Sequence, residues 1–320
     1  MCRASAGVSD RTAMSRRTAH WRCVWFCVAV LLWRANALHA QELEPRTYSA
    51  SPVGTNFVIA GYAHVSGDVL TDPSLPISGV SARIGTYVIG YVRTFALANR
   101  TASIGFAQPF MSGNMSGLVI GAPTEIHRAG IGDMQLRFAL NLIGNPALSP
   151  EAFAQAKPVT SLGASLTVQA PTGQYVPSHL VNIGNNRWAF KPEIGLSQPW
   201  GDWFFEVSAG AWFFTNNGDF FNGHIRHQAP LIVTQLHGGY TFRPGFWLAV
   251  DAGYAQGGAT SVNDGPAGTG QANARGGVTL AVPLGHGWSA KLAYSRGFVT
   301  RAAGNYQIVT VAVQYRWFDH

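Results

Sequence analysis

The chain has 320 residues, of which 47% are hydrophobic, 12% are charged and 37 are glycine, and its formal net charge is +7. Low charge with abundant glycine and aromatic residues is atypical of a disordered chain. Six of the 22 Lys and Arg residues and one of the 15 acidic residues precede residue 41, which leaves 16 basic against 14 acidic residues, or +2. A basic surface for nucleic acid is therefore excluded, and we expect no nucleic-acid partner.

Residues 1–40 have the pattern of an export signal. Arg16, Arg17 and Arg22 precede the apolar run 23–33, and the small residue Ala40 lies before the expected cleavage point. An apolar run of 11 residues is too short to cross a bilayer as a helix. Met14 is an alternative start that would give the signal an ordinary length. We therefore expect a signal peptide at 1–40 and a single barrel domain at 41–320.

The three cysteines, Cys2, Cys23 and Cys27, all lie in the expected signal. The remaining chain would contain no thiol and no disulfide.

After residue 54 the chain breaks into segments in which apolar and polar side chains alternate. Between residues 161 and 170, for example, leucine, valine and alanine alternate with serine, threonine and glutamine. Successive strand side chains point to opposite faces, so each segment predicts a strand with two different environments. Few helices are available to cover an apolar face, which favours a transmembrane barrel with lipid outside and a polar interior.

The fold class predicted is all-β: an antiparallel up-and-down transmembrane barrel of about 12 strands. The predicted strands are 55–67, 82–95, 101–112, 132–142, 160–170, 187–198, 203–214, 230–242, 246–256, 273–282, 288–296 and 306–317. The connections are alternately short and long. Outer-membrane barrels have short periplasmic turns and longer outer loops, so we expect both termini in the periplasm.

The connection 143–159 is long although it falls on the short-turn side. Ser149, Pro150 and Glu151, followed by residues 152–156, predict a capped single helical turn there. The sequence assigns this segment no function.

Tryptophans give an independent test, because aromatic side chains gather where hydrocarbon meets headgroups. All seven that follow the signal lie near predicted strand ends. Five are beside periplasmic turns or the chain end, and two are near outer strand ends: Trp200, Trp203, Trp247, Trp288 and Trp317, then Trp188 and Trp212. This sorting indicates an aromatic girdle.

Alternation places most charged strand residues opposite the apolar face. Arg or Lys facing lipid near mid-membrane costs roughly 2–4 kcal/mol, so this placement supports a polar interior. The residues predicted to line the lumen are Asp133, Arg137, Lys191, Glu193, Glu206, Asp251, Arg275, Lys291 and Arg316. They form either a structural charge network or a path for solute. Because the signs are balanced, no strong ion selectivity is expected.

Strand 203–214 departs from simple alternation because aromatic residues occur on both faces. The inward ones, together with two in the following loop, are predicted apolar contacts for a solute: Phe204, Trp212, Phe214, Phe220 and Phe221. Packing of a plug or loop against these rings is the alternative.

Motifs of enzymes are absent from the sequence. There is no glycine-rich phosphate loop, no G-x-S-x-G and no H-E-x-x-H. His224 and His227 have the spacing of a metal-binding pair but lack a clear third ligand. We expect no catalytic residue, no metal and no cofactor, and hence not an enzyme.

Several segments resemble the bacterial outer-membrane barrel family labelled as the meta-pathway of phenol degradation. They are residues 51–57, 67–76, 130–133, 170–175, 182–188, 190–193 and 314–317. The resemblance covers nearly all of the chain after the signal. It implies an outer-membrane transporter that takes up small molecules, aromatic ones included, and it supplies no catalytic residues.

The leading hypothesis is an outer-membrane channel for passive uptake of small, aromatic or hydrophobic solutes into the periplasm. Its expected partners are outer-membrane lipid, a small-molecule solute and the barrel-assembly machinery, since the final strand alternates and ends in aromatic residues. Two alternatives stay open: a closed structural or adhesive barrel whose outer loops bind, and an outer-membrane hydrolase.

Overall fold

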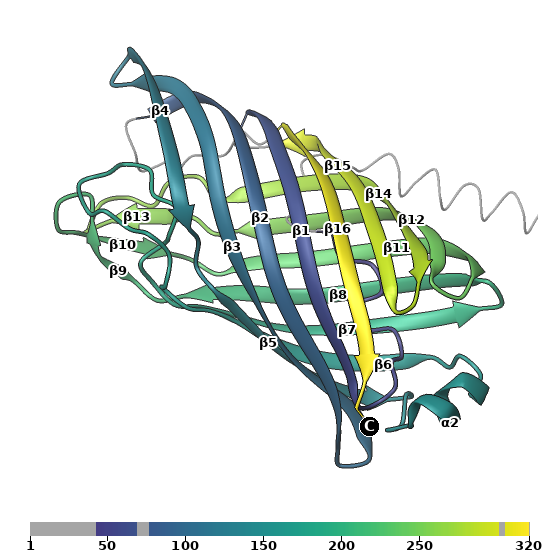
Figure 1. Ribbon diagram of the computed structural model, residues 1–320. Helices are drawn as coiled ribbons and strands as arrows, with labels where there is room; N and C mark the ends of the chain where they lie inside the picture. The colour runs from purple at the N-terminus through teal and green to yellow at the C-terminus, as the bar shows by residue number, and fades with distance from the viewer. Residues whose placement is uncertain (1–42, 69–76, 301–304, 320) are drawn as a thin grey trace, which may run out of the picture. The chain divides into compact units, whose positions relative to one another are not determined.

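The computed structural model describes residues 43–68, 77–300 and 305–319, which belong to one compact unit, Ala37–His320. The predicted export signal, with Met14 and the cysteines, lies outside the described residues. The described chain forms an antiparallel sheet that closes on itself, because β1 pairs with β2 and β16 and β2 also pairs with β3 (Figure 1). The predicted transmembrane-type barrel is therefore confirmed.

The barrel has twelve strand positions, the number expected from the sequence. Its strands are β1 (Thr55–Asp68), β2 (Ile77–Leu97), β3 (Arg100–Val119), β4 (Ala122–Ile131), β5 (Gln135–Ile143), β6 (Ser161–Gln169), β7 (Ala189–Trp200), β8 (Trp203–Phe214), β11 (Leu231–Arg243), β12 (Phe246–Gly257), β14 (Gln271–Gly285), β15 (Trp288–Thr300) and β16 (Tyr306–Phe318). β4 and β5 share one position, because β3 pairs with β4 along its second half and with β5 along its first half.

The two ends of the barrel differ. At the end where β16 finishes, here called the turn end, two-residue turns join β2 to β3 and β7 to β8. Ala98 and Asn99 in the first of these turns both have positive φ, the geometry that matches the twist of a tight hairpin. At the opposite end, here called the loop end, most connections are longer, although a two-residue turn joins β3 to β4. There β9 (Asn217–Phe220), β10 (His224–Gln228) and β13 (Thr260–Val262) form a separate three-stranded sheet.

Two groups of strands were not predicted. Residues 113–131 looked like a loop because of their glycines, but they extend β3 and form β4 in one paired hairpin. The three short strands at the loop end were also expected to be loop. In both places hairpin pairing overrides a weak intrinsic strand preference.

The helix predicted near residue 150 is present. α2 (Pro150–Gln155) begins after Ser149, whose hydroxyl accepts a hydrogen bond from the Ala152 backbone. This cap and the proline in the first turn explain why a helix as short as six residues forms. Across the described residues, no helix is long and apolar enough to span a membrane.

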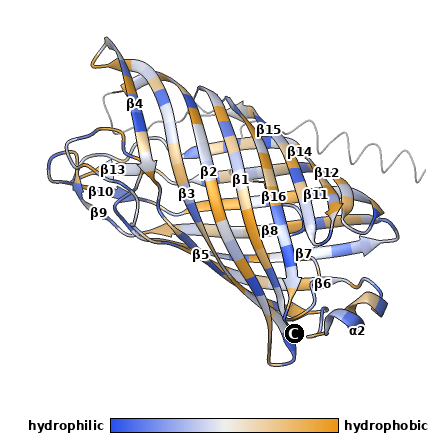
Figure 2. Ribbon diagram, viewed as in Figure 1, coloured by the Kyte–Doolittle hydropathy of each residue, from blue (hydrophilic) through white to orange (hydrophobic). Residues whose placement is uncertain are grey.

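The outer face of the barrel is apolar. Hydrophobic and hydrophilic residues alternate along the strands (Figure 2). Large side chains in mid-strand are openly exposed, with Val250 at 64%, Ile194 at 58% and Leu236 at 57%. Such a surface suits hydrocarbon and not water.

The tryptophan girdle is present at the turn end, with one exception. Trp200, Trp203, Trp288 and Trp317 are exposed on the outside. Trp247 instead faces the interior, where it packs edge-on against Phe204 with ring centroids 5.9 Å apart. Sequence position near a turn does not reveal the face, and residue 247 shares the inward parity of Asp251.

A charge on the outer face tests this orientation. Leu292 is exposed on the outside of β15, while the next residue, Ala293, lines the interior cavity. We expect Leu292→Arg to lower the free energy of unfolding by about 2–4 kcal/mol, because the guanidinium would enter lipid. Urea unfolding in lipid vesicles measures it. Ala293→Arg, the matched control, should cost much less; equal losses would contradict the assigned faces.

Candidate functional site: the barrel interior

The interior holds a cavity of about 1710 Å³ that runs between the strands and the chain segment before β1. Of the predicted site residues, those that line it are Arg137, Lys191, Glu193, Glu206, Asp251, Lys291, Arg316, Trp212 and Phe214. Those that are not among its lining residues are Asp133, Arg275, Phe204, Phe220 and Phe221. Whether any of them contacts a solute stays a prediction.

Residues 43–52, here called the N-terminal segment, lie inside the barrel and also line the cavity. The segment is held by side chains of the barrel wall. The Tyr48 hydroxyl donates to Glu193 Oε1 at 2.9 Å and lies 2.9 Å from Ser165 Oγ. Glu44 adds a 2.7 Å ion pair with Lys291. No pattern in the sequence indicates that this segment enters the barrel.

Glu206 is the second point of attachment. It accepts hydrogen bonds from the Arg46 backbone N–H at 2.5 Å, from Ser49 Oγ at 2.9 Å and from Ser197 Oγ at 2.7 Å. Hydrogen bonds to a charged acceptor contribute about 1.5–3 kcal/mol each. The carboxylate therefore fixes two residues of the N-terminal segment to the wall.

The Arg46 side chain continues this attachment. Its Nη2 donates to Thr241 Oγ1 at 2.6 Å, and its guanidinium lies 4.1 Å from the Phe204 ring and 5.7 Å from the Trp247 ring. Phe204 is thus covered by Arg46 and is only 3% exposed. Plug packing, the alternative interpretation of this ring, describes the structure better than solute contact.

A pair of glycines makes room for Tyr48. Gly163 on β6 and Gly195 on β7 are direct partners in the sheet. A Cβ at Gly163 would lie 2.6 Å from a ring carbon of Tyr48, and one at Gly195 would lie 2.2 Å from two others. No other residue type fits beneath the ring at these positions.

The other two carboxylates predicted to line the lumen, Asp251 and Asp133, bind residues of the barrel wall and of a loop-end connection. Asp251 lies 2.7 Å from His237 Nδ1 and accepts a 2.6 Å hydrogen bond from Thr279. Asp133 accepts from the side chain of Gln169, from the backbone N–H of Gly173 and from both the backbone and the side chain of Asn185, at 2.8–3.0 Å. Asp133, between β4 and β5, therefore anchors the connection 170–188.

Cations lie over the inward aromatic rings at the loop end. Lys191 Nζ is 5.5 Å from the Trp212 ring, and the Arg187 guanidinium is 4.5 Å from the Phe214 ring. In the adjoining small sheet Arg226 lies 5.4 Å from Phe220, which is 6% exposed. The predicted aromatic surface is therefore partly covered by charge.

Two predicted residues stand apart from the cavity. Arg275 packs against the Tyr306 ring at 3.9 Å and donates to Ser295 Oγ at 3.3 Å. Phe221 has positive φ in the turn between β9 and β10. Arg275 is therefore held by the barrel wall, and Phe221 forms part of a turn.

The described residues contain no group of three His, Cys, Asp or Glu side chains able to hold a metal ion. His224 and His227 instead hydrogen-bond to Asn263 and Asn216, respectively.

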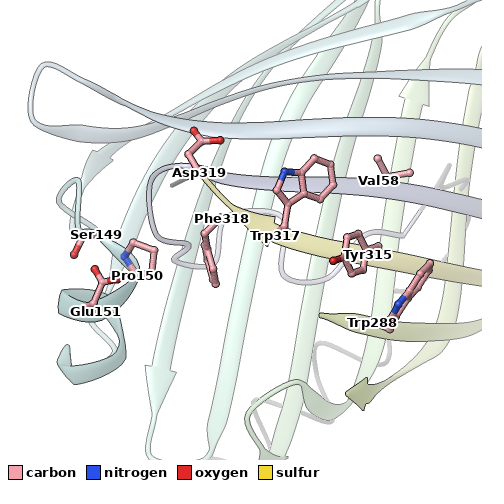
Figure 3. A pocket seen from close by; sticks show the side chains of 9 residues that line it. All are labelled: Val58, Ser149, Pro150, Glu151, Trp288, Tyr315, Trp317, Phe318 and Asp319. Atoms are coloured by element: carbon pink, nitrogen blue, oxygen red, sulfur yellow. The ribbon is translucent and has the colours of Figure 1, made fainter. Parts of the chain in front are cut away.

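A second hollow, of about 1170 Å³, lies on the outside at the turn end (Figure 3). It is bounded by α2 and by the girdle residues Trp288, Tyr315 and Trp317. Hydrogen bonds from the Glu151 backbone and from Ser149 lower the pKa of Glu151 at its edge, so that carboxylate stays ionised. Trp288 lines both this hollow and the interior cavity.

The comparisons with known proteins agree with this geometry. Residues 67–316 match the model of a protein family described as "Putative MetA-pathway of phenol degradation". The chain belongs to this family. Membership confirms the resemblance expected from the sequence. Among curated proteins, none matches the chain.

Solved structures show the same fold. The COG4313 outer membrane channel from Pseudomonas putida F1 is 22% identical, with a TM-score of 0.71, over 86% of this chain and 100% of that one. The β domain of the Bordetella autotransporter Brka is 12% identical, with a TM-score of 0.50, over 82% of this chain and 100% of that one. The first is described as an outer membrane channel, and both likenesses show that this chain has the fold of such β-barrels.

The glycine pair allows a test of how the N-terminal segment is seated. Gly195→Ala places a methyl group where the Tyr48 ring lies, so we expect the segment to leave its position, since overpacking costs about 1–3 kcal/mol. A spin label attached through Thr47→Cys should become more mobile. Gly218→Ala is the matched control, because a Cβ there meets nothing within 4 Å. Equal mobility in the two variants would contradict the seating.

Proposed function

We propose that this outer-membrane barrel gives small solutes, including aromatic or hydrophobic ones, a passive route into the periplasm. The observation that carries the proposal is the cavity of about 1710 Å³ enclosed by the barrel wall. It is bounded on one side by the N-terminal segment, whose contacts with the barrel wall are hydrogen bonds and an ion pair. Movement of this segment would widen the route.

The orientation of the barrel supports uptake. Short turns gather at the end where β16 finishes, as they do on the periplasmic side of outer-membrane barrels. We therefore propose that both termini lie in the periplasm, that residues 1–40 are an export signal and that residues 41–320 form the single barrel domain. The alternating, aromatic β16 is the segment that the barrel-assembly machinery would bind.

A second candidate is a closed structural or adhesive barrel. The N-terminal segment occupies part of the lumen, and the β9–β10–β13 sheet gives the loop end an ordered surface. A barrel of this kind would carry no current, so conductance separates the two candidates.

Weakening the attachment at Glu206 tests the channel. Glu206→Gln keeps the shape of the side chain but removes the charge that holds Arg46 and Ser49. Since each lost charge-assisted hydrogen bond is worth about 1.5–3 kcal/mol, we expect a severalfold higher conductance in planar bilayers and faster swelling of liposomes in a small sugar.

Asp251→Asn is the matched control. It also removes one inward negative charge, but Asp251 bonds to the wall residues His237 and Thr279 and not to the N-terminal segment. Its conductance should stay near that of the unmodified protein. A barrel that shows neither current nor flux, with or without Glu206→Gln, would overturn the channel in favour of the closed barrel.

A further inference from the structure

The wall of the cavity is chemically uneven. β1, β2 and β3 lie together on one side of the barrel, opposite β7, β8 and β11 (Figure 1). None of the cavity-lining residues on β1–β3 is charged. Those that are apolar or glycine include Phe57, Ile59, Val88, Gly90, Val92 and Gly105. This surface, here called the apolar wall, favours contact with hydrocarbon or an aromatic ring.

Arg137 borders the apolar wall directly. On β5 it is the sheet partner of Gly105, which is in turn the partner of Val92, which pairs with Phe57. In the other direction Arg137 pairs with Thr167, which pairs with Lys191. Adjacent strands are about 4.8 Å apart, so the backbone positions that carry the two cations lie roughly 10 Å apart along one row.

Arg137 and Arg316, the partner of Phe57 at the far end of this row, both lack a carboxylate among the described residues, but Arg316 is exposed. Lys191 lies 3.1 Å from Glu193. Within the described residues no acidic side chain pairs with Arg137; its guanidinium lies 5.4 Å from the Tyr48 ring, and its buried Nη2 has no hydrogen-bond partner. A buried donor without a partner costs about 1–3 kcal/mol, and more when it is charged.

The carboxylates of the interior are already engaged. Glu206 binds the N-terminal segment and Ser197, Glu193 binds Tyr48 and Lys191, and Asp251 binds His237 and Thr279. The sequence has nearly equal numbers of inward positive and negative side chains, but in the structure these carboxylates are paired and Arg137 is not. The acceptor for Arg137 must come from outside the described wall, and an anion complements the guanidinium better than a neutral group does.

We propose that the cavity binds an amphipathic monoanion, a carboxylate that carries an apolar chain or ring. Its carboxylate accepts hydrogen bonds from Arg137, and its apolar part lies along the apolar wall. The inference rests on the proposed function and narrows its solute class. A neutral hydrocarbon would leave Arg137 unpaired, and a small hydrophilic anion would leave the apolar wall uncovered.

Block of the KCl current through the full-length channel in planar bilayers tests the site. Three probes separate charge from tail: octanoate has both features, acetate has the charge alone, and octyltrimethylammonium has the tail with the opposite charge. We expect octanoate to block at a concentration at least about tenfold below that of either other probe, since each 1.4 kcal/mol of binding free energy is tenfold.

Two substitutions locate the effect. Arg137→Gln should raise the half-blocking concentration of octanoate about tenfold, and Arg137→Lys should restore part of the loss. Val92→Thr, which keeps the shape but adds a hydroxyl to the apolar wall, should weaken octanoate and leave acetate unchanged. Lys157→Gln is the control, because it removes one positive charge at an exposed residue that does not line the cavity.

The outcomes distinguish this inference from the channel itself. Equal block by octanoate and octyltrimethylammonium, or an unchanged octanoate block in Arg137→Gln, would overturn the site while the current upholds the channel. Absence of current would overturn the channel. Calorimetric titration of octanoate into the detergent-solubilised protein, with and without Arg137→Gln, then decides the site: Arg137-dependent binding supports it, and no binding overturns it.

Discussion

Closure of the sheet is the constraint on which the rest of this structure depends. Hydrocarbon offers no partner to a backbone N–H or C=O, so each must be bonded inside the protein, and an open sheet edge would be costly. Here the first and last strands pair along thirteen residues, from Thr55 with Phe318 to Gly67 with Tyr306. Asp319 completes the seam, since it accepts from Asn56, pairs with Arg93 and donates its backbone N–H to Gly54. The clamp is exposed, so it positions the chain end more than it stabilises the fold.

Closure also removes the usual hydrophobic core. Most large apolar side chains face lipid, so much of the interior is left to smaller, polar and charged groups that need partners of their own. The N-terminal segment meets that need for two of them, because Glu193 and Glu206 both accept hydrogen bonds from it. The N-terminal segment therefore lies in the lumen because the buried carboxylates need hydrogen-bond donors. Its presence there also narrows the path for a solute.

The sequence reveals local features of this protein and hides distant ones. Strand faces follow from alternation, and the cap of α2 follows from Ser149 and Pro150, because both depend on neighbours in the chain. Seating of Tyr48 could not be predicted, since its partner Glu193 is 145 residues away and its space depends on two glycines that meet only across strands. The inward face of Trp247 and the β3–β4 hairpin are local features, by contrast: the first follows from the parity that Trp247 shares with Asp251, and the second was hidden by the glycines of residues 113–131. Charge signs could be counted, but their pairing could not.

The pairing of the charges affects which solutes the barrel interior attracts. A carboxylate that is already bonded contributes little to the attraction of a solute, whereas an arginine with an unbonded buried nitrogen attracts an anion at short range. The electrostatic character of such a lumen is thus set by which charges remain unpaired, and not by their sum. In this barrel Arg137 stands beside a surface with no charged lining residue, so charge and apolar contact occur on adjoining strands. A solute that satisfies both must itself be divided into an anionic and an apolar part.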